Sequence, residues 1–415
     1  MSATPPLHPS LPLPGTAALD GVSTTAVHGG SGRPPVHDAI PPPVVLSSTY
    51  RFRNTAELLA FRRDHLRREE YGRYGNPTVR ETEGKLAALE AGTTSTHDLD
   101  ALVFASGMTA ITTLLLALLR SGSHLILTDD GYRRTRQFVS TFLGRLGIAH
   151  TIVPATDQAA LESAIRPETR VLVTELPTNP FLRVPDLRPL VDLTHRHRIR
   201  TIIDATFATP YNLRPLEHGA DFVVHSATKY LGGHHDLLAG VVVGRPDAIA
   251  ALRELQGVLG GISDPHAAYL LHRGLRTFAL RMERHNTNGL AVATFLETHP
   301  RVRRVFYPGL PSHPDHAVAT ALMRGHGGVV SFEIDGDGEE TARFVDGLHL
   351  AAIAPSLGGV DTLVEQPALM SYHELTADQR RHLGITDNLV RLACGIEDTD
   401  DLVNDLRLGL AQIHG

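Results

Sequence analysis

Short apolar runs recur along the first part of the chain, and segments of helical length separate them. The runs cover residues 101–105, 124–128, 170–175, 200–204, 221–225 and 239–244. Because they are rich in β-branched residues and largely lack polar alternation, they are typical of strands buried on both faces. Segments such as 108–120 and 187–198 have the apolar spacing of helices. The alternation predicts an α/β fold with a mostly parallel central sheet and helices on both faces.

The pattern changes near residue 257. Apolar positions three and four residues apart predict a long helix over 267–298. The remainder has a strand-like run at 328–335 and helical patterns at 339–348 and 399–413, which indicate a smaller α+β domain. Ten prolines among the first 43 residues predict an extended arm, since proline fixes φ and lacks an N–H donor. The predicted division is an arm (1–60), a large α/β domain (61–260), a linking helix (261–300) and a C-terminal α+β domain (301–415).

Composition narrows the class of protein. The chain has 415 residues, of which 42% are hydrophobic, and this is enough apolar material for a large core. A formal net charge of −6 provides no basic stripe for a phosphate backbone, so no nucleic acid is expected as a partner. Cys394 is the single cysteine, and no apolar run reaches the roughly 20 residues that cross a membrane. Residues 1–14 lack the pattern of a targeting peptide, so a cytoplasmic location is expected.

Lys229 is the first candidate for chemistry. It follows Ser226 and Thr228 and precedes Gly232 and Gly233. A lone lysine in a glycine-rich loop is usually a surface residue. An amine beside two hydroxyls also suits an imine with pyridoxal phosphate (PLP), because the hydroxyls can bind the phosphate ester.

Asp204 ends an apolar run about one βα step before Lys229. Ligands of open α/β sheets bind at the carboxyl ends of the strands. An aspartate placed there can pair with the pyridine nitrogen of PLP and keep the ring an electron sink. The alternative for this residue type is a turn or a helix N-cap.

Two further segments offer cofactor contacts. Residues 105–110 turn from a strand into a helix, where free backbone N–H groups and the helix dipole favour a phosphate. Tyr132 follows the next strand and could stack on a flat ring, although half-burial accounts for most tyrosines.

Anion contacts are also expected from the two ends of the chain. Tyr71 and Arg73 lie before the sheet begins, where they suit a phosphate clamp in a neighbouring subunit. Arg391 alternates with apolar neighbours in a strand, and a half-buried arginine needs an anion such as an amino-acid carboxylate. No metal is expected, because the consecutive residues 234–236 (His-His-Asp) point in diverging directions. The chain also has neither a dinucleotide nor a P-loop fingerprint.

These motifs resemble those of the Cys/Met-metabolism PLP enzymes, and within that family the chain looks most like the plant-type cystathionine γ-synthases. The likeness runs from about Val45 to the C-terminus. Its ordered motifs are residues 70–78, 105–110, 132–136, 177–182, 204–210, 226–234, 305–314, 354–359 and 366–372, and the segment around Arg391. The resemblance implies the fold of type I PLP enzymes, amino-acid substrates, and a homotetramer whose active sites are shared between subunits.

The resemblance also implies a role for each matching residue. Lys229 would carry the Schiff base and shuttle protons, and Tyr132 would stack on the ring and assist catalysis. The other implied cofactor ligands are Asp204, Thr206, Asn179, Gly107, Met108, Ser226 and Thr228, with Tyr71 and Arg73 from a neighbouring subunit. The implied substrate ligands are Arg391, Ser356, Asn179 and Asp361.

The activity that the resemblance implies is γ-replacement on an O-activated homoserine by cysteine, which gives cystathionine. An alternative is a γ-lyase that eliminates another γ substituent, such as a halide, with an alkyne as product where that group is vinylic. A further alternative is a catalytically silent assembly protein with the same fold. The chain departs from the usual family pattern at Ala205, His235, Asp361 and residues 393–394. Asp361, Thr362 and His235 lie in segments expected near the substrate.

Overall fold

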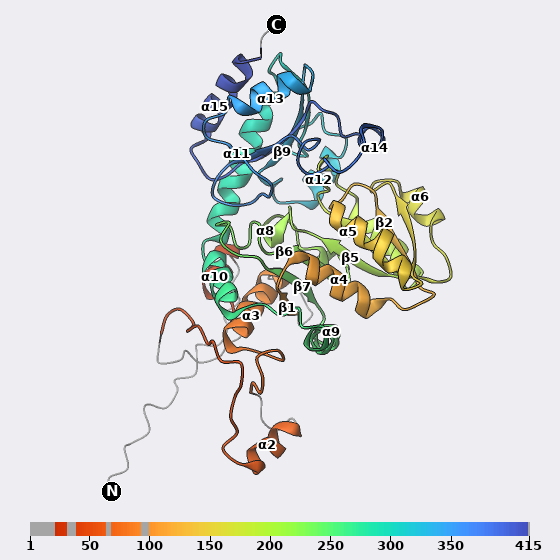
Figure 1. Ribbon diagram of the computed structural model, residues 1–415, viewed down its shortest axis with the longest axis vertical. Coiled ribbons are helices and arrows are strands. Elements are labelled where there is room, and N and C mark those ends of the chain that lie inside the picture. Colours follow the sequence, from red (N-terminus) through yellow and green to blue (C-terminus); the bar gives the residue numbers. More distant parts are fainter. Residues whose placement is uncertain (1–20, 31–38, 64–67, 93–98, 414–415) are drawn as a thin grey trace.

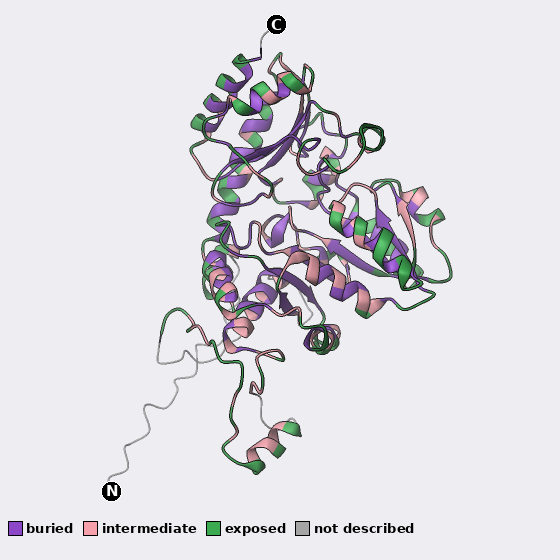
Figure 2. Ribbon diagram, viewed as in Figure 1, coloured by how far each residue is buried: buried purple, intermediate pink, exposed green. Residues whose placement is uncertain are grey.

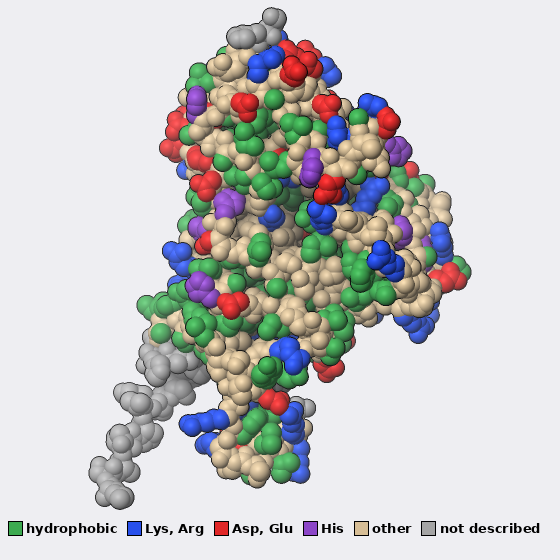
Figure 3. Space-filling model, in the orientation of Figure 1, with side chains coloured by type: hydrophobic (Ala, Val, Ile, Leu, Met, Phe, Trp, Pro, Cys, Tyr) green, Lys and Arg blue, Asp and Glu red, His purple; other side chains and the backbone are tan. Residues whose placement is uncertain are grey.

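The computed structural model describes residues 21–30, 39–63, 68–92 and 99–413. The opening segment, for which no targeting pattern is predicted, lies outside these residues. A large domain forms the middle of the molecule, with a smaller C-terminal domain at one end and an arm carrying α2 (Thr55–Arg62) at the other (Figure 1). Acidic and basic side chains are interspersed over the face in Figure 3. Within the described residues, no helix is long and apolar enough to span a membrane.

The large domain is built on a seven-stranded sheet with the order β1-β7-β6-β5-β4-β2-β3. The strands are β1 (Asp100–Phe104), β2 (His124–Thr128), β3 (Ala149–Val153), β4 (Thr169–Glu175), β5 (Arg200–Asp204), β6 (Phe222–Ser226) and β7 (Gly240–Gly244). Only β7 runs antiparallel to its neighbours in this sheet, so the predicted α/β fold with a mostly parallel sheet is confirmed. The sequence pattern missed β3, an edge strand whose side chains are mostly half-exposed.

Helices cover both faces of this sheet, and the strands between them are buried except for the edge strand β3 (Figure 2). The helices of this part are α3 (Pro77–Ala91), α4 (Gly107–Leu118), α5 (Arg133–Gln137), η2 (Phe138–Leu143), α6 (Gln158–Ser163), α7 (Leu187–Arg196), α8 (Thr209–Asn212), η3 (Pro215–His218) and α9 (Pro246–Leu259). One buried cluster joins α4 and α9 to the sheet, and others lie on the opposite face beneath α3 and α7.

The C-terminal domain has a five-stranded sheet with the order β10-β11-β12-β9-β8. Its strands are β8 (Val302–Phe306), β9 (Val329–Ile334), β10 (Ala352–Ile353), β11 (Leu363–Glu365) and β12 (Leu389–Ala393), and its helices are α12 (His316–Leu322), α13 (Gly338–Asp346), α14 (Ala377–His382) and α15 (Thr399–Ala411). The predicted α+β domain is therefore present. The strand expected at 328–335 and the helices expected at 339–348 and 399–413 correspond to β9, α13 and α15.

The long helix expected over 267–298 is divided into α10 (Pro265–Leu275) and α11 (Phe278–Glu297). Buried Arg281 accounts for the break. Its guanidinium donates to the carbonyl oxygen of Gly274 at 2.8 Å and to that of Tyr230 at 2.6 Å. Because α10 ends here, the Arg281 side chain of α11 can bind both the end of α10 and the loop after Lys229. The hydrophobic cluster along α11 includes residues of both domains, so this helix joins them.

The N-terminal region contains helix α1 (Val22–His28) as well as α2, so the arm is not extended throughout. Buried Lys85 of α3 donates hydrogen bonds to three backbone carbonyl oxygens at the end of α1, those of Ala26, Val27 and Gly29, at 3.0, 3.0 and 2.7 Å. A cation at a helix C-terminus satisfies carbonyls that have no partner within the helix. This part of the arm is thus docked on the large domain.

Gly240 allows β7 to pass directly beneath the start of α4. A Cβ at this position would lie 2.2 Å from the carbonyl oxygen of Ser106 and 2.7 Å from the Cα of Gly107. Both neighbours are backbone atoms, so they cannot move aside as a flexible side chain does. Glycine at 240 is therefore required for the turn that begins α4.

We expect Gly240→Ala to lower the unfolding midpoint by several degrees, because overpacking against backbone costs about 2–3 kcal/mol. Gly144→Ala is the matched control, since Gly144 has right-handed helical backbone and no atom within 4 Å of the added Cβ. Thermal unfolding of both variants checks the expectation. Equal midpoints would contradict the proposed close contact.

Candidate active site

The carboxyl ends of three neighbouring parallel strands place Glu175 (β4), Asp204 (β5) and Ser226 (β6) along one edge of the large sheet. In an open α/β sheet this edge is the usual ligand site. The residues expected to bind the cofactor therefore gather at one location, together with the start of α4.

Lys229 lies in a tight turn that follows β6. Its backbone N–H donates to Ser226 O at 3.1 Å, and its carbonyl accepts from Gly233 N at 2.8 Å. Gly233 has φ +77°, and a Cβ there would lie 2.0 Å from the Arg281 guanidinium. Left-handed backbone and the close cation both require glycine at this position. The turn is fixed by Arg281 from below, which leaves the Lys229 side chain directed toward the C-terminal domain.

The Lys229 amine donates to the hydroxyl of Ser356 at 2.6 Å. Ser356 has φ +96°, which is rare outside glycine and costs on the order of 1–3 kcal/mol. Burial, and then the positive charge of Arg391, lower the pKa of Lys229 to about 8, against the opposing effect of Glu365. The amine is therefore neutral more often than an ordinary lysine, as an imine-forming nucleophile needs.

Arg391 is buried in β12 and contacts three groups. Its guanidinium donates to Asn179 Oδ1 at 3.1 Å and to Ser356 O at 3.0 Å, and it pairs with Glu365 Oε1 at 3.0 Å. Glu365 is 1% exposed and also accepts hydrogen bonds from Ser371. The Arg391 Nε donor has no partner among the described residues. A buried guanidinium with a free donor is suited to a carboxylate.

Asp204 and Ser226 are connected through Thr206. Asp204 Oδ1 accepts from Thr206 N at 3.0 Å and from Thr206 Oγ1 at 2.5 Å, and the same hydroxyl oxygen accepts from Ser226 N at 2.8 Å. The structure gives Asp204 Oδ2 no hydrogen bond within the described residues. Burial raises the pKa of Asp204, against the Thr206 hydrogen bonds that favour its charged form. A cationic ring nitrogen would stabilise the carboxylate there.

The start of α4 faces Ser226. The Ser106 side chain caps the helix by accepting from Thr109 N at 3.1 Å, and the first-turn N–H groups of Gly107 and Met108 lack partners within the helix. A Cβ on Gly107 would lie 2.9 Å from the Ser226 Cβ, so the two backbones meet closely. No hydrogen bond of the Ser226 hydroxyl is found among the described residues, which leaves it free for an anion.

Thr228 is less available than Ser226. Its hydroxyl donates to Ala239 O at 3.2 Å and accepts from Ala239 N at 3.0 Å. To bind a phosphate, the Thr228 hydroxyl would have to redirect its hydrogen atom away from the Ala239 carbonyl. This residue thus also closes the turn that carries Lys229.

Tyr132 precedes α5, and 47% of it is exposed. Its backbone N–H donates to the Glu175 carboxylate. The side chain is thus open to a ligand at the sheet edge, while its backbone is fixed to β4.

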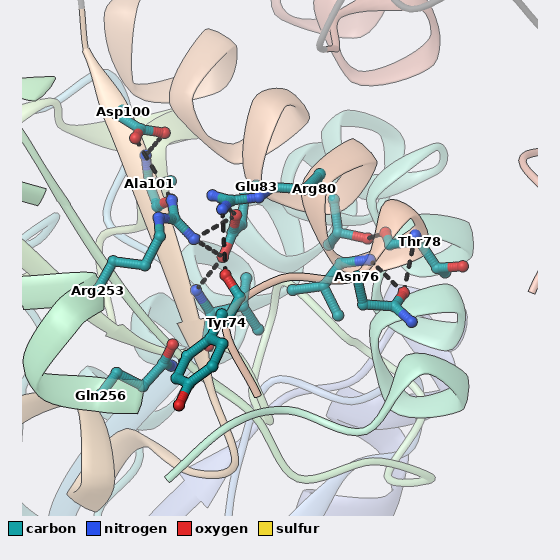
Figure 4. Close-up of polar contacts among 12 residues, drawn as sticks. Tyr74, Asn76, Thr78, Arg80, Glu83, Asp100, Ala101, Arg253 and Gln256 are labelled. Atoms are coloured by element: carbon teal, nitrogen blue, oxygen red, sulfur yellow. Dashed lines mark hydrogen bonds and ion pairs between the residues drawn. The ribbon is translucent and has the colours of Figure 1, made fainter. Parts of the chain in front are cut away.

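Tyr71 and Arg73 are not joined to Lys229, Ser226 or Gly107 of their own chain by any hydrogen bond or ion pair of the described residues. Arg73 donates to Gly257 O at 2.5 Å instead, and Tyr71 is 40% exposed. A polar network supports the chain that follows (Figure 4). In it, Arg80 and Arg253 pair with buried Glu83 at 3.3 and 2.9 Å.

Two cavities lie near these residues. The smaller, about 520 Å³, is lined by Thr228, His235 and Ser356 among others. The larger, about 1480 Å³, lies behind the Tyr132 turn and is lined by none of Lys229, Asp204 or Arg391. Lys229, Asp204 and Arg391 do not line the smaller cavity either, but Ser356, which accepts from the Lys229 amine, does, so we place the site beside this cavity.

Asp361 is exposed, and no hydrogen bond or ion pair of the described residues joins it to Lys229, Ser356 or Arg391. His235 packs against Gly359, two residues before Asp361, since a Cβ on Gly359 would lie 1.9 Å from the His235 ring. Two of the departures from the family pattern are therefore close in space. No group of metal-binding side chains is present in the described part of the chain.

Comparison with known proteins assigns the family. A family model described as Cys/Met metabolism PLP-dependent enzyme matches residues 23–411. The chain belongs to this family. It is 48% identical over 398 residues to cystathionine γ-synthase 1, chloroplastic, of Arabidopsis thaliana, covering 95% of this chain and 70% of the relative. It is 39% identical to cystathionine γ-lyase of Bacillus subtilis, covering 94% and 99%.

A solved structure agrees with this assignment. Cystathionine γ-lyase from Lactobacillus plantarum in complex with L-serine superposes with a TM-score of 0.87 at 37% identity, covering 95% of this chain and 99% of that one. The predicted fold type, the PLP cofactor and the enzymatic nature of the chain are confirmed. The site fits PLP, because it combines an amine of lowered pKa, a carboxylate with one free oxygen, and a free hydroxyl at a helix start.

The sequence pattern missed two acidic residues of the site. Glu365 lies in the three-residue strand β11, where it pairs in register with Arg391. Glu175 ends a run that indicated only a strand. The signal that could have identified both is a carboxylate at the end of an otherwise apolar strand, which needs a partner there.

We expect apo-enzyme to form its imine with PLP faster as pH rises through about 8, because the neutral Lys229 amine is the nucleophile. Arg391→Met should raise this midpoint, since it removes a cation. Glu365→Gln should lower it, since it removes an anion. Stopped-flow absorbance across pH measures all three. Identical midpoints in the two variants would contradict the assigned electrostatics.

Proposed function

We propose that this enzyme catalyses γ-replacement on an O-activated homoserine with cysteine, giving cystathionine. The observation that carries the proposal is the placement of the Lys229 amine 2.6 Å from Ser356, whose carbonyl oxygen is bound by buried Arg391. An amino acid held by its carboxylate at Arg391 presents its Cα near this amine. The similarity to a plant cystathionine γ-synthase over 95% of the chain supports this reaction in particular.

The residues at the sheet edge would hold the cofactor. Lys229 would bind its aldehyde carbon, Asp204 its ring nitrogen and Asn179 its ring hydroxyl, with Tyr132 on the ring face. The phosphate would lie among the N–H groups of Gly107 and Met108 and the hydroxyls of Ser226 and Thr228. Thr206 would orient Asp204. When bound, PLP supplies an electron sink for negative charge on the substrate carbons.

Lys229 is the residue that moves protons. It would take the proton from the substrate Cα, give it up to the carbon that came from the PLP aldehyde, and then take one from Cβ, so that the γ substituent can leave and a thiol can add at Cγ. Ser356 accepts a hydrogen bond from the amine and so directs it between these positions. Arg391 keeps the carboxylate fixed meanwhile, and Glu365 and Asn179 keep Arg391 in place.

γ-Elimination is the second candidate, and it needs the same residues. The cystathionine γ-lyase relatives support it. The departures at Asp361 and His235 support it as well, because a changed loop near the γ group alters which nucleophile adds there. A γ-halogenated or other γ-substituted amino acid is the substrate class in this case, with an alkyne as product from a vinylic halide.

We also propose a homotetramer in which Tyr71 and Arg73 bind the cofactor phosphate of a neighbouring subunit. Among the described residues, neither side chain has a hydrogen bond or ion pair to its own chain's Lys229, and Arg73 donates to Gly257 O instead. The cytoplasmic location stays a prediction.

Substrate assays distinguish the two reactions. Purified enzyme is incubated with O-succinyl-, O-acetyl- and O-phosphohomoserine and with γ-halogenated amino acids, with and without cysteine, and products are identified by mass spectrometry. We expect cystathionine from at least one ester. Lys229→Ala is the control and should lose both turnover and the visible imine band. Formation of 2-oxo acid and ammonia alone, unaffected by cysteine, would overturn the synthase proposal in favour of the lyase.

Mixed oligomers test the shared site. Lys229→Ala and Arg73→Ala chains are inactive separately, but mixing them should restore about a quarter of the sites, because a hybrid dimer has one intact pair. Lys229→Ala mixed with Asp204→Asn is the matched control and should recover nothing, since both residues serve one chain's site. Failure of the first mixture to exceed the second would contradict the shared site.

A further inference from the structure

Glu175 lies directly beside Asp204 at the edge of the sheet. The two residues are register partners on the parallel strands β4 and β5, so their side chains point to the same face. Partners of this kind have Cβ atoms about 5 Å apart. Glu175 has no role in the proposed reaction, and its position therefore calls for a separate explanation.

Glu175 holds the turn that carries Tyr132. Its Oε1 atom accepts the hydrogen bond of the Tyr132 backbone N–H. A Cβ on Gly131 would lie 3.2 Å from the same oxygen, so the turn packs directly on the carboxyl group. Because 47% of Tyr132 is exposed, few side-chain contacts fix its ring. The backbone anchor on Glu175 is what fixes the ring's height above the sheet edge.

The surroundings favour one negative charge on the pair. Burial, and then the neighbouring Asp204 and Asp130, raise the pKa of Glu175, and the Tyr132 hydrogen bond opposes this. Tyr372 packs on the same side, and burial raises the pKa of its phenol, so it stays neutral. Among the described residues, His225 is the basic group that acts on Asp204, from the opposite face of β6.

The hydrogen bonds decide which acid keeps the charge. Asp204 accepts two from Thr206, and both favour its ionised form. Within the described part of the chain, Glu175 accepts only one, from the Tyr132 backbone N–H, and a neutral carboxyl or an amide oxygen can also accept this hydrogen bond. Two adjacent, largely buried carboxylates do not both ionise without a cation between them.

We propose that Glu175 is a positioning residue for the cofactor: as a neutral acid it anchors Tyr132 over the ring, and it leaves the negative charge to Asp204. This inference rests on the proposed PLP site and adds a residue that the family resemblance does not assign. In this proposal the two neighbouring carboxyl groups have different tasks: Asp204 pairs with the ring nitrogen, and Glu175 holds Tyr132.

The test compares Glu175→Gln with Glu175→Ala in full-length protein. Glutamine keeps a neutral acceptor for Tyr132 N, so the PLP dissociation constant and the visible circular dichroism of the bound cofactor should stay within about twofold. Alanine removes the anchor, and the dissociation constant should rise about tenfold, the effect of one lost buried hydrogen bond. Glu175→Leu, which preserves volume, replaces the alanine variant should that variant not fold.

A double-mutant cycle with Tyr132→Ala separates positioning from general support. If Glu175 acts through Tyr132, adding Glu175→Ala to Tyr132→Ala should change PLP binding little further. Asp130→Asn is the control, since Asp130 is held by Thr178 and has no bond to Tyr132. The proposal would be overturned if the effects of Glu175→Ala and Tyr132→Ala on the PLP dissociation constant multiplied in the double variant. It would also be overturned if Glu175→Gln bound PLP as weakly as Glu175→Ala. Because binding is measured without turnover, a failed substrate assay leaves this result standing, whereas a wild-type chain without an imine band rejects the PLP site itself.

Discussion

The site depends on one buried guanidinium. Arg391 belongs to the C-terminal sheet, yet it donates to Asn179 of the large domain and to the carbonyl of Ser356, whose hydroxyl accepts from Lys229. Glu365 offsets the cost of burying the charge, and the pair is in register on adjacent strands. This cation thus adds a second polar link between the two domains beside the one that the Lys229 amine makes to Ser356. The proposed carboxylate ligand and the candidate nucleophile are therefore parts of one hydrogen-bonded unit.

A second cation supports the same unit from beneath. Arg281 is buried without an acidic partner among its described contacts, and its burial lowers its pKa to about 10. Arg281 donates to the carbonyl oxygens of Gly274 and Tyr230 instead. The end of α10 exposes the first carbonyl, and the missing side chain at Gly233 leaves room for the guanidinium. Burying this charge and holding Ser356 at a positive φ both cost stability. In return, Arg281 holds the turn that carries Lys229, and Ser356 holds the amine of that lysine. Strain of this kind persists only where the surroundings fix the conformation.

Local patterns were sufficient for much of the fold and for part of the site. Lys229, Asp204, Ser226 and Arg391 each lie at or near an apolar strand, and the carboxyl edge of a parallel sheet brings the first three together. Long-range contacts were not predictable in this way. The break before α11 follows from Arg281 reaching Tyr230, which is 51 residues away.

The missed residues show the same limit. Glu365 and Glu175 are single acids in apolar runs, and only strand pairing reveals that one faces Arg391 and the other Asp204. A residue's own neighbours in sequence carry no information on which strand will lie beside it. The roles of the gathered residues, as opposed to their location, rest on family likeness and stay predictions.

The domains also meet at a second place, and this bears on specificity. Arg133 and Arg134, which follow Tyr132, both pair with Glu374 of the C-terminal domain. Tyr132 is thus bound to the sheet through Glu175, and the two arginines that follow it are linked to the C-terminal domain through Glu374. In the proposed site, Arg391, Ser356 and Lys229 would fix the groups around Cα, so a change of substrate would not come from these residues without loss of the shared chemistry. Selection of the γ group must therefore come from the segments beyond this unit, such as the turn where His235 packs on Gly359.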